Sequence, residues 1–418
     1  MKQCAEQFEL KRMAAKWLFG LMLLSGIMAG AAGLPQWDMA KLETAPAWRV
    51  APKIKSKYPN IRGIFYEGLA FGKMPSTQVF AWLGLPERTT YGKVPAMVLI
   101  HGGGGTAFEE WVKLWTDRGY AAIAMDTSGC IPGGDNSKRP RHKDGGPGGF
   151  GGFATLDSPA GDQWAYHAVA DVILANSLLR SLPEVDPERI VVTGISWGGY
   201  LTCISAGTDS RFKLAVPVYG CGFFNEAGSN MKKALDGIGQ EKTVRWMARW
   251  DASNYLEQAK MPFLWISGTN DVWFPLTSLT KSLALTSGQK NLCVKVRLVH
   301  GQGQGQSQSE IFAFADAILN NGVSLPEINA AGQIKTSAWI DFRSKTPLKE
   351  AALIFTRDGG PINGRKWETA PAMIKDNRVT ADIPSGTTAW FFNLTDTRGL
   401  TVSSKFKECS SGGFSGDQ

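Results

Sequence analysis

The sequence predicts an α/β protein in which helices flank a mostly parallel sheet, followed by a small all-β domain. Between residues 62 and 325, short apolar runs typical of buried strands alternate with longer stretches of helical periodicity. After residue 330 the helical pattern ends, and short alternating strands follow with turn residues between them. A serine flanked by glycines, at residues 194–198, lies where one buried strand meets a helix.

The first 33 residues have the composition of a secretory signal peptide. Basic residues at 11, 12 and 16 precede an apolar stretch at 17–28 and small residues at 29–33. The apolar stretch is short for a membrane span, so we expect a secreted or periplasmic protein with no stable span after cleavage. An uncleaved anchor is the alternative. Residues 34–61, rich in Pro and Lys, predict an extended lead-in.

The elements of the larger predicted domain, 62–325, follow in order. Alternation at 63–71 and 77–85 predicts a hairpin. Further strands are predicted at 96–100, 121–125, 189–193, 214–219, 262–267 and 293–299, and helices at 108–118, 163–182, 241–260 and 309–320. Residues 127–161 predict a long glycine-rich loop at the carboxyl end of a strand, where α/β sheets bind ligands. We expect this loop to shape the substrate site.

The C-terminal region predicts a β-sandwich-like accessory domain at 330–407 and a disordered polar tail at 408–418. Its strands are expected at 338–343, 350–356, 378–383 and 388–394. The sequence favours packing of this domain on the larger one, with carbohydrate or partner binding as the alternative.

Residues 194–198 read G-I-S-W-G between a strand and a helix. Such a sharp turn holds a serine hydroxyl above the edge of the sheet, and it needs glycines because side chains there would collide with neighbouring backbone. An ordinary tight turn is the alternative. The strand before Ser196 and the helix after it favour a nucleophile.

A base and an acid follow Ser196 in the chain. Only one of the four histidines does so, and it lies between the last predicted strand and the flexible glycine-rich run at 301–305: this is His300. Asp271 follows the apolar strand 262–267 and is placed to orient that imidazole. Asp251 and Glu257 also lie between the serine and the histidine, but they fall in a predicted helix. A surface histidine and a helix-capping aspartate are the alternatives.

A glycine-rich loop, H-G-G-G-G at 101–105, follows the strand 96–100. Backbone N–H groups of Gly103, Gly104 and Trp197 are expected to form an oxyanion hole. A phosphate-binding loop is disfavoured because the Gly-Lys-Ser/Thr sequence is absent. His101 is expected to support the loop and not to act as a base.

Composition excludes several other functions. The net charge is +8, but basic residues are scattered except at 138–143, and no nucleic-acid-binding module is recognisable. A solvated loop is the favoured interpretation of that cluster.

Five cysteines would remain after signal cleavage, an odd number that leaves at least one unpaired: Cys130, Cys203, Cys221, Cys293 and Cys409. Their spacing predicts no metal site, and we expect no cofactor. The sequence predicts neither the disulfide pairing nor the oligomeric state.

With these motifs in place, the chain resembles the bacterial acetylxylan esterase and dienelactone hydrolase-like branch of the α/β-hydrolases, which is similar to the catalytic domain of prolyl oligopeptidases. The resemblance covers roughly residues 60–322 and rests on H-G-G-G at 101–104, the pentapeptide at 194–198, G-T-N-D at 268–271 with F-P at 274–275, and H-G at 300–301. It implies Ser196, Asp271 and His300 as a catalytic triad, with Gly103 and Trp197 near the oxyanion. Dienelactone hydrolases carry a cysteine where this chain has Ser196.

We therefore expect a secreted serine carboxylesterase that removes small acyl groups, such as acetyl, from carbohydrate esters through an acyl-enzyme. The substrate class follows from the family analogy alone. Trp164, Trp197 and Trp273 are candidates for stacking on sugar rings. The basic cluster at 138–143 would instead favour a uronate-bearing substrate. A prolyl oligopeptidase-like serine peptidase acting on short peptides is one alternative. A non-catalytic binding protein on this scaffold is another, disfavoured because the Ser-Asp-His order is complete.

Overall fold

A computed structural model describes residues 33–87, 92–134 and 139–409. The predicted signal peptide lies outside the described residues except for Gly33, and so does the predicted tail beyond Cys409. Within the described ranges, no helix is both long enough and apolar enough to span a membrane.

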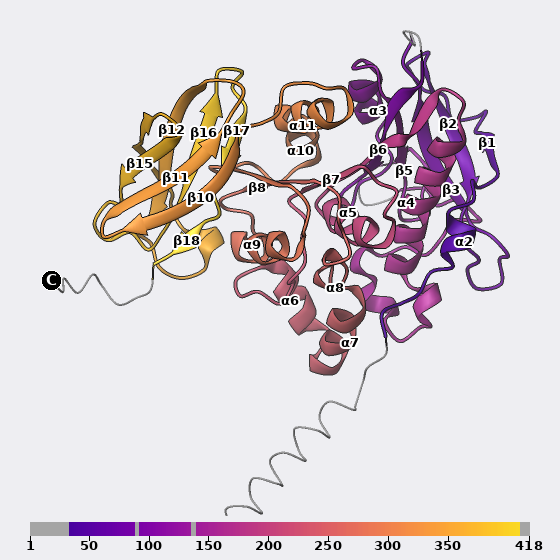
Figure 1. Ribbon diagram of the computed structural model, residues 1–418. Helices are drawn as coiled ribbons and strands as arrows, with labels where there is room; N and C mark the ends of the chain where they lie inside the picture. The colour runs from indigo at the N-terminus through magenta and orange to yellow at the C-terminus, as the bar shows by residue number, and fades with distance from the viewer. Residues whose placement is uncertain (1–32, 88–91, 135–138, 410–418) are drawn as a thin grey trace, which may run out of the picture.

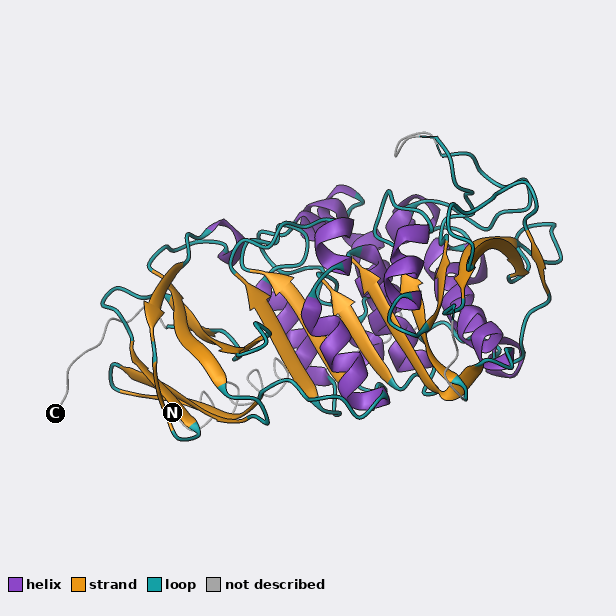
Figure 2. Cartoon of the chain, turned by 90° about the horizontal axis from the view of Figure 1, so that it is seen from above, coloured by secondary structure: helices purple, strands orange, loops and turns teal. Residues whose placement is uncertain are grey.

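The larger part of the described chain is built on one mixed sheet of nine strands, in the order β1-β2-β3-β5-β4-β6-β7-β8-β9 (Figures 1 and 2). Strands β4 to β9 run parallel to one another, and β1, β2 and β3 extend the sheet beyond β5 in antiparallel pairing. The bounds are β1 Trp48–Val50, β2 Ile61–Glu67, β3 Gln78–Gly84, β4 Val94–Ile100, β5 Ala121–Met125, β6 Val185–Ile195, β7 Leu214–Val218, β8 Phe263–Gly268 and β9 Lys290–Lys295.

Helices cover both faces of this sheet, as Figure 2 shows. The bounds are α2 Met39–Leu42, α3 Glu109–Thr116, α4 Trp164–Ser181, α5 Trp197–Thr208, α6 Asn230–Gly237, α7 Gln240–Trp250, α8 Ser253–Leu256, α9 Leu276–Leu285, α10 Gln302–Gln306 and α11 Ser309–Leu319, with short 3₁₀ turns at Phe150–Thr155 (η1) and Ala160–Asp162 (η2). In β4, Val98 and Ile100 join the core beneath α4 and α5, while Met97 and Leu99 join the core beneath α3 and α11. Burial on both faces explains why β4 is apolar throughout.

The predicted fold class is confirmed, and several predicted boundaries are wrong. The lead-in at 34–61 is not simply extended, because it contains α2 and the sheet strand β1. The helix predicted at 241–260 is two helices, α7 and α8, and α6 was not predicted. The strand predicted at 293–299 ends at Lys295. Two residues later, at Arg297, the chain turns with a φ of 55°. Alternating valines alone do not continue a strand once the backbone has left the sheet.

The glycine-rich run at 301–305 is also not the flexible loop that its composition predicts. It forms α10, and Gly305 is buried against Ile195 and Tyr219, where an added Cβ would lie 2.7 Å from the Ile195 side chain. Glycine at this position therefore permits close packing of α10 on the end of β6.

The C-terminal region consists of two antiparallel sheets, drawn in orange and yellow in Figure 1. One has the order β10-β11-β15-β14, and the other has the order β13-β12-β16-β17, with β18 paired to β16. The bounds are β10 Glu327–Ile334, β11 Ser337–Arg343, β12 Leu348–Thr356, β13 Glu368–Pro371, β14 Met373–Lys375, β15 Arg378–Asp382, β16 Ala389–Asp396, β17 Thr401–Ser403 and β18 Lys407–Glu408, with a 3₁₀ turn at Ile362–Gly364 (η3). The four strands predicted at 338–343, 350–356, 378–383 and 388–394 are present as β11, β12, β15 and β16, with ends that differ by one or two residues, and β10, β13, β14, β17 and β18 were not predicted.

The β region covers the free edge of the large sheet. The backbone N–H of Val294, in the edge strand β9, donates to Ser403 Oγ at 2.8 Å, and its carbonyl accepts from Asn393 Nδ2 at 3.1 Å. Covering an edge strand satisfies its backbone groups and prevents pairing with other chains. The buried carboxylate of Glu310 reinforces this contact, because it accepts from Thr401 N and from Lys295 Nζ, both at 2.9 Å.

We predict that Glu310→Ala lowers the free energy of unfolding by about 2–4 kcal/mol, because it leaves the Thr401 N–H and the Lys295 ammonium without their acceptor. The expected result is a fall in Tm of several degrees in a thermal scan. Glu310→Gln keeps an acceptor and should lose less. Glu241→Ala, which removes a carboxylate with 88% side-chain exposure, is the control. Equal Tm values for Glu310→Ala and Glu241→Ala would contradict this account.

Candidate active site

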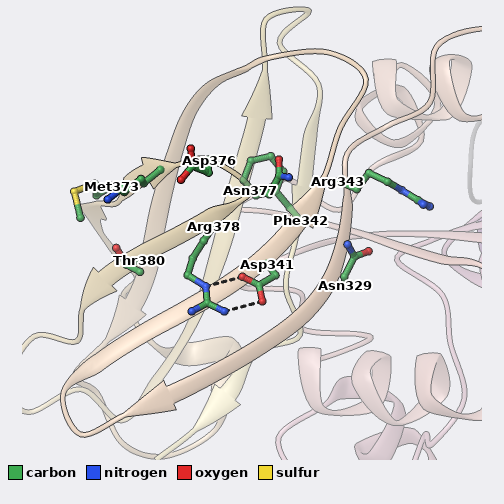
Figure 3. A pocket seen from close by; sticks show the side chains of 10 residues that line it. Asn329, Asp341, Phe342, Arg343, Met373, Asp376, Asn377, Arg378 and Thr380 are labelled. Atoms are coloured by element: carbon green, nitrogen blue, oxygen red, sulfur yellow. Dashed lines mark hydrogen bonds and ion pairs between the residues drawn. The ribbon is translucent and has the colours of Figure 1, made fainter.

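A hollow of about 250 Å³ lies at the carboxyl ends of β4 and β6. It is lined by Gly102, Gly103, Gly104, Gly105, Phe108, Arg139, Ile195, Ser196, His300, Gly301 and Gln302. A larger hollow, of about 540 Å³, lies on the β region (Figure 3). There the Asp341 carboxylate is paired with the Arg378 guanidinium at 2.6 and 2.8 Å. The smaller hollow contains the predicted nucleophile and base and is therefore the candidate active site.

Ser196 occupies a strained turn between β6 and α5. Its φ is 58° and its ψ is −117°, in a region that residues other than glycine rarely adopt. Backbone hydrogen bonds hold the turn: Ser196 N donates to Val218 O, and Ser196 O accepts from Tyr200 N, each at 2.9 Å. An added Cβ at Gly198 would lie 2.0 Å from Ile100 O, and one at Gly194 would lie 2.1 Å from Gly198 O. Both flanking glycines are therefore required by close backbone packing.

The predicted base and acid are hydrogen-bonded to each other. His300 Nδ1 lies 2.7 Å from Asp271 Oδ2, and the carboxylate is buried. The other carboxylate oxygen, Oδ1, accepts from the backbone N–H groups of Trp273 and Phe274, each at 2.8 Å. Because the carboxylate can only accept here, the Nδ1 atom carries the proton, and Nε2 is left as the basic nitrogen.

Two aromatic residues to which the sequence analysis assigned no role position the His300 ring. Phe274 stacks on it with an interplanar angle of 6°, and Tyr219 lies 4.7 Å from it between ring centroids. The Tyr219 hydroxyl donates to the carbonyl oxygens of Val299 and Gly301, at 3.2 and 3.1 Å, on both sides of the histidine. Burial raises the pKa of the Tyr219 hydroxyl, which therefore remains a donor. No sequence spacing distinguishes Tyr219 from any aromatic at a strand end.

Ser196 and His300 line the same hollow, but no hydrogen bond joins them among the described residues. In hydrolases without a bound substrate, the bond between nucleophile and base is often long and tightens when the complex forms. The arrangement thus brings together the serine, histidine and aspartate that the sequence singled out.

The glycine loop at 101–105 packs directly on the Trp197 side chain. An added Cβ at Gly103 would lie 2.4 Å from Trp197 Cδ1. Among the described residues, none accepts a hydrogen bond from the backbone N–H of Gly103 or of Trp197, and Trp197 begins helix α5. Two such donors beside a serine are what an oxyanion requires.

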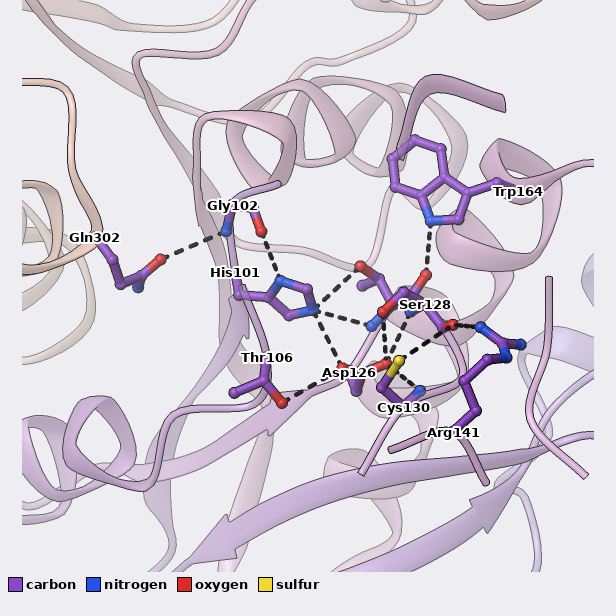
Figure 4. A network of polar contacts seen from close by, with 10 residues as sticks. His101, Gly102, Thr106, Asp126, Ser128, Cys130, Arg141, Trp164 and Gln302 are labelled. Carbon is purple, nitrogen blue, oxygen red and sulfur yellow. Dashed lines mark hydrogen bonds and ion pairs between the residues drawn. The ribbon is translucent and has the colours of Figure 1, made fainter. Parts of the chain in front are cut away.

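His101 supports this loop through a buried polar network (Figure 4). Its Nδ1 lies 2.8 Å from Gly102 O, and its Nε2 accepts from Thr127 N at 3.1 Å. Because the carbonyl can only accept and the amide can only donate, Nδ1 carries the proton. In a trans peptide the N–H of Gly103 points opposite to the carbonyl of Gly102, so this hydrogen bond turns that N–H away from His101.

The same network anchors the long loop. Asp126 Oδ1 accepts from Ser128 N at 2.9 Å and from Cys130 N at 2.8 Å, and the Arg141 guanidinium donates to Ser128 O (Figure 4). The same guanidinium also donates to Gly146 O. In the loop predicted at 127–161, the described residues, 127–134 and 139–161, are irregular apart from η1, η2 and an isolated β-bridge between Cys130 and Arg141. It contributes to the hollow through Arg139, a residue that the sequence considered only as part of a basic cluster.

Helix α10 contributes to the oxyanion loop as well. Gln302 Oε1 accepts from Gly102 N at 3.4 Å, and Figure 4 shows this contact. Gln302 follows His300 closely in the chain, so the loop bearing the base is connected to the loop bearing the oxyanion donors.

Two of the three tryptophans predicted to stack on sugar rings cannot do so. Trp164 was a candidate for sugar stacking, but its side chain is fully buried and its Nε1 donates to Thr127 O at 2.7 Å. It packs against Trp197, which is itself largely buried, so both rings belong to the core. Trp273 is 40% exposed and remains a candidate. The five cysteines of the described chain are all unpaired.

Two protein-family models match the chain. The model for acetyl xylan esterase matches residues 37–226, which include the oxyanion loop and the serine turn. The model for the prolyl oligopeptidase family matches residues 156–321, which include the serine turn and both of its predicted partners.

The individual relatives likewise include both acetyl xylan esterases and peptidases. The solved acetyl xylan esterase from Paenibacillus sp. R4 superposes with a TM-score of 0.53 and 25% identity, covering 68% of this chain and 93% of that one. Acetyl xylan esterase 1 from Thermoanaerobacterium sp. JW/SL YS485 has a TM-score of 0.52 at 17% identity, covers 70% of this chain and 95% of that one, and supports the fold alone. Dipeptidyl-peptidase 5 of Schizosaccharomyces pombe is 26% identical over 221 residues, which are 49% of this chain. The uncharacterized peptidase YuxL of Bacillus subtilis is 30% identical over 159 residues, which are 36% of this chain. The chain spans less than a third of either curated relative, 30% and 21% respectively.

We predict that Gly103→Ala lowers kcat for a chromogenic acetate ester by about 10²–10³-fold, the effect of losing one oxyanion donor. The new methyl group would meet the Trp197 ring and displace the Gly103 N–H. Gly303→Ala is the matched control, since it adds a methyl group to open space in the neighbouring helix α10. Equal activity of the two variants would contradict the role assigned to the Gly103 N–H.

We also predict a pH-dependent stability contribution from His101. Burial lowers its pKa, and acceptance of the Thr127 N–H requires an unprotonated Nε2. In the unfolded chain a histidine has a pKa of about 6.5. The contribution of His101 to the free energy of unfolding is therefore complete above that pH, and it is lost as the pH falls toward the lower pKa of the folded state. The Tm of the wild type minus that of His101→Asn should therefore shrink between pH 7.5 and pH 5. The other titrating groups are common to both proteins. A difference in Tm that stays constant with pH would contradict the assignment.

Proposed function

We propose that this chain, a serine hydrolase of the α/β-hydrolase superfamily, is a carboxylesterase that removes small acyl groups, acetyl in particular, from carbohydrate esters. The observation that carries the proposal is the convergence of Ser196, His300 and the glycine loop at 102–105 on one hollow of about 250 Å³. A hollow of this size suits a short acyl group. Sequence residues 1–33 support export of the enzyme.

In the proposed mechanism, Ser196 Oγ attacks the ester carbonyl carbon while His300 Nε2 accepts the hydroxyl proton. The Asp271 carboxylate stabilises the imidazolium through the 2.7 Å contact with Nδ1. The oxyanion of the tetrahedral intermediate accepts hydrogen bonds from the backbone N–H groups of Gly103 and Trp197.

The intermediate collapses as the bond between the carbonyl carbon and the alcohol oxygen breaks. His300 Nε2 donates its proton to the leaving alcohol, and an acyl ester on Ser196 remains. Water then attacks this ester, with His300 again taking the proton, and the carboxylic acid is released as Ser196 recovers its hydrogen. Acyl transfer to water is thus completed without a change in the net protonation of the site.

Aromatic packing holds Trp197, whose backbone N–H is one of the proposed oxyanion donors. The Trp197 ring is surrounded by Phe153, Trp164, Tyr200 and Phe224, with ring centroids 5.3 to 6.1 Å away. The exposed ring of Trp273, two residues after Asp271, is available to stack on a sugar.

A serine peptidase acting on short peptides is the second candidate. The match to the prolyl oligopeptidase family over residues 156–321 favours it, because that region includes Ser196, Asp271 and His300. Both reactions use the same acyl-enzyme chemistry and differ in the leaving group.

The proposal predicts that the wild type hydrolyses 4-nitrophenyl acetate and releases acetate from acetylated xylan, and that Ser196→Ala abolishes both activities. Asp271→Asn should lower kcat by about 10³–10⁴-fold, because an amide at this position favours the wrong imidazole tautomer. Full activity of Ser196→Ala would contradict the assignment of the nucleophile. Cleavage of dipeptide amides without ester turnover would support the peptidase instead.

A further inference from the structure

We infer that Arg139 binds a carboxylate of the substrate, so that the active site selects esters that carry a negative charge. This inference rests on the proposed esterase function and narrows its substrate class. Arg139 lines the same hollow as Ser196 and His300, and the remaining lining residues that the structure describes are glycines, Phe108, Ile195, Gln302 and the two catalytic candidates. Among these described lining residues, Arg139 is the one with a permanent charge.

The hollow brings Arg139 and the proposed nucleophile together. Arg139, Ser196 and the glycines of the oxyanion loop line the same space of about 250 Å³. A substrate seated on Ser196 therefore comes within reach of Arg139.

The structure separates Arg139 from the rest of the basic cluster at 138–143. Arg141 is used within the loop, since its guanidinium donates to Ser128 O and Gly146 O. His142 accepts from Asp144 N and packs on Phe65 with ring centroids 4.7 Å apart. Lys143 has 86% side-chain exposure and pairs with a surface aspartate. Of these four described residues, Arg139 alone lines the hollow.

The chemistry of this position fits a carboxylate. Arg139 is half-buried, and a charge interaction is stronger where water is partly excluded. A hydrogen bond between a guanidinium and a carboxylate is charge-assisted, whereas a neutral hydroxyl offers a weaker acceptor. A hollow of about 250 Å³ leaves little room between this cation and the ester.

The carboxylate can belong to either side of the ester bond. On the alcohol side it would be that of an acetylated sugar acid, and on the acyl side it would be that of a dicarboxylic half ester. Both share the chemistry that Arg139 recognises. Pairs of small esters that differ only in this charge distinguish the two sources.

The experiment compares kcat/KM for neutral and anionic partners. Phenyl acetate against 4-acetoxybenzoate tests the alcohol side, and 4-nitrophenyl butyrate against mono-4-nitrophenyl succinate tests the acyl side. For the preferred anionic ester, Arg139→Gln should lower kcat/KM by about 10- to 100-fold, mainly through KM, the range expected for loss of a charge-assisted hydrogen bond. Its neutral partner should change less than about twofold, because that ester carries no carboxylate for Arg139 to bind. Arg139→Lys should recover part of the loss, because it restores the positive charge on a side chain of different shape.

Lys143→Gln is the matched control, because it removes one positive charge from the same loop outside the hollow. It should leave both members of each pair unchanged. An equal loss on neutral and anionic esters in Arg139→Gln would overturn the inference, since that pattern indicates a general effect on the oxyanion loop. An equal loss of kcat/KM for the anionic ester in Lys143→Gln would overturn it as well, because that result indicates long-range attraction of the anionic ester by the positive charge of the loop. Absence of Ser196-dependent turnover of the neutral esters is a different result, and it would contradict the proposed function itself.

Discussion

The packing of Gly198 against the end of β4 is the constraint on which the rest of the site depends. The first turn of α5 lies so close to this strand that any side chain at residue 198 would overlap the Ile100 carbonyl. This contact fixes where the helix begins, and the connection to β6 must then be made by a single residue with a positive φ, Ser196. The strain at Ser196 costs about 1–3 kcal/mol, and the surrounding sheet stabilises it. In return, the hydroxyl and the first N–H of α5 are held at the same point above the sheet.

The loops around this fixed point are connected to one another. His101 orients the oxyanion loop from below, and Gln302 contacts the same loop from the helix that follows the base. Tyr219 holds both sides of His300. The Asp271 loop is tied to the C-terminal β region, because Asn270 Nδ2 donates to the carbonyl oxygens of Asn363 and Arg365 at 3.1 and 2.8 Å. The β region therefore covers the sheet edge and also braces the loop that carries the proposed acid.

The parts of this structure that the sequence predicts are those in which local pattern and tertiary packing agree. Strand β4 is apolar throughout because it is buried, and Ser196 is flanked by glycines because the backbone there is in close contact. Both features can therefore be recognised from the sequence. Predictions failed where a distant contact decides the outcome. Glycine at residue 305 indicates flexibility by composition, but it is there because α10 packs on Ile195. Trp164 is near the site in sequence order, but its indole is committed to a buried hydrogen bond. Arg139 could not be separated from its basic neighbours until the folded loop assigned each of them a different environment.

The central claim is that the strained turn makes Ser196 a nucleophile activated by His300. Reaction with a fluorophosphonate, followed by peptide mass mapping, tests it without assuming any natural substrate. The account predicts one phosphonyl adduct, on the peptide containing Ser196, formed much more slowly in His300→Ala and absent in Ser196→Ala. An adduct on another residue, or labelling of Ser196 at the same rate without His300, would contradict it.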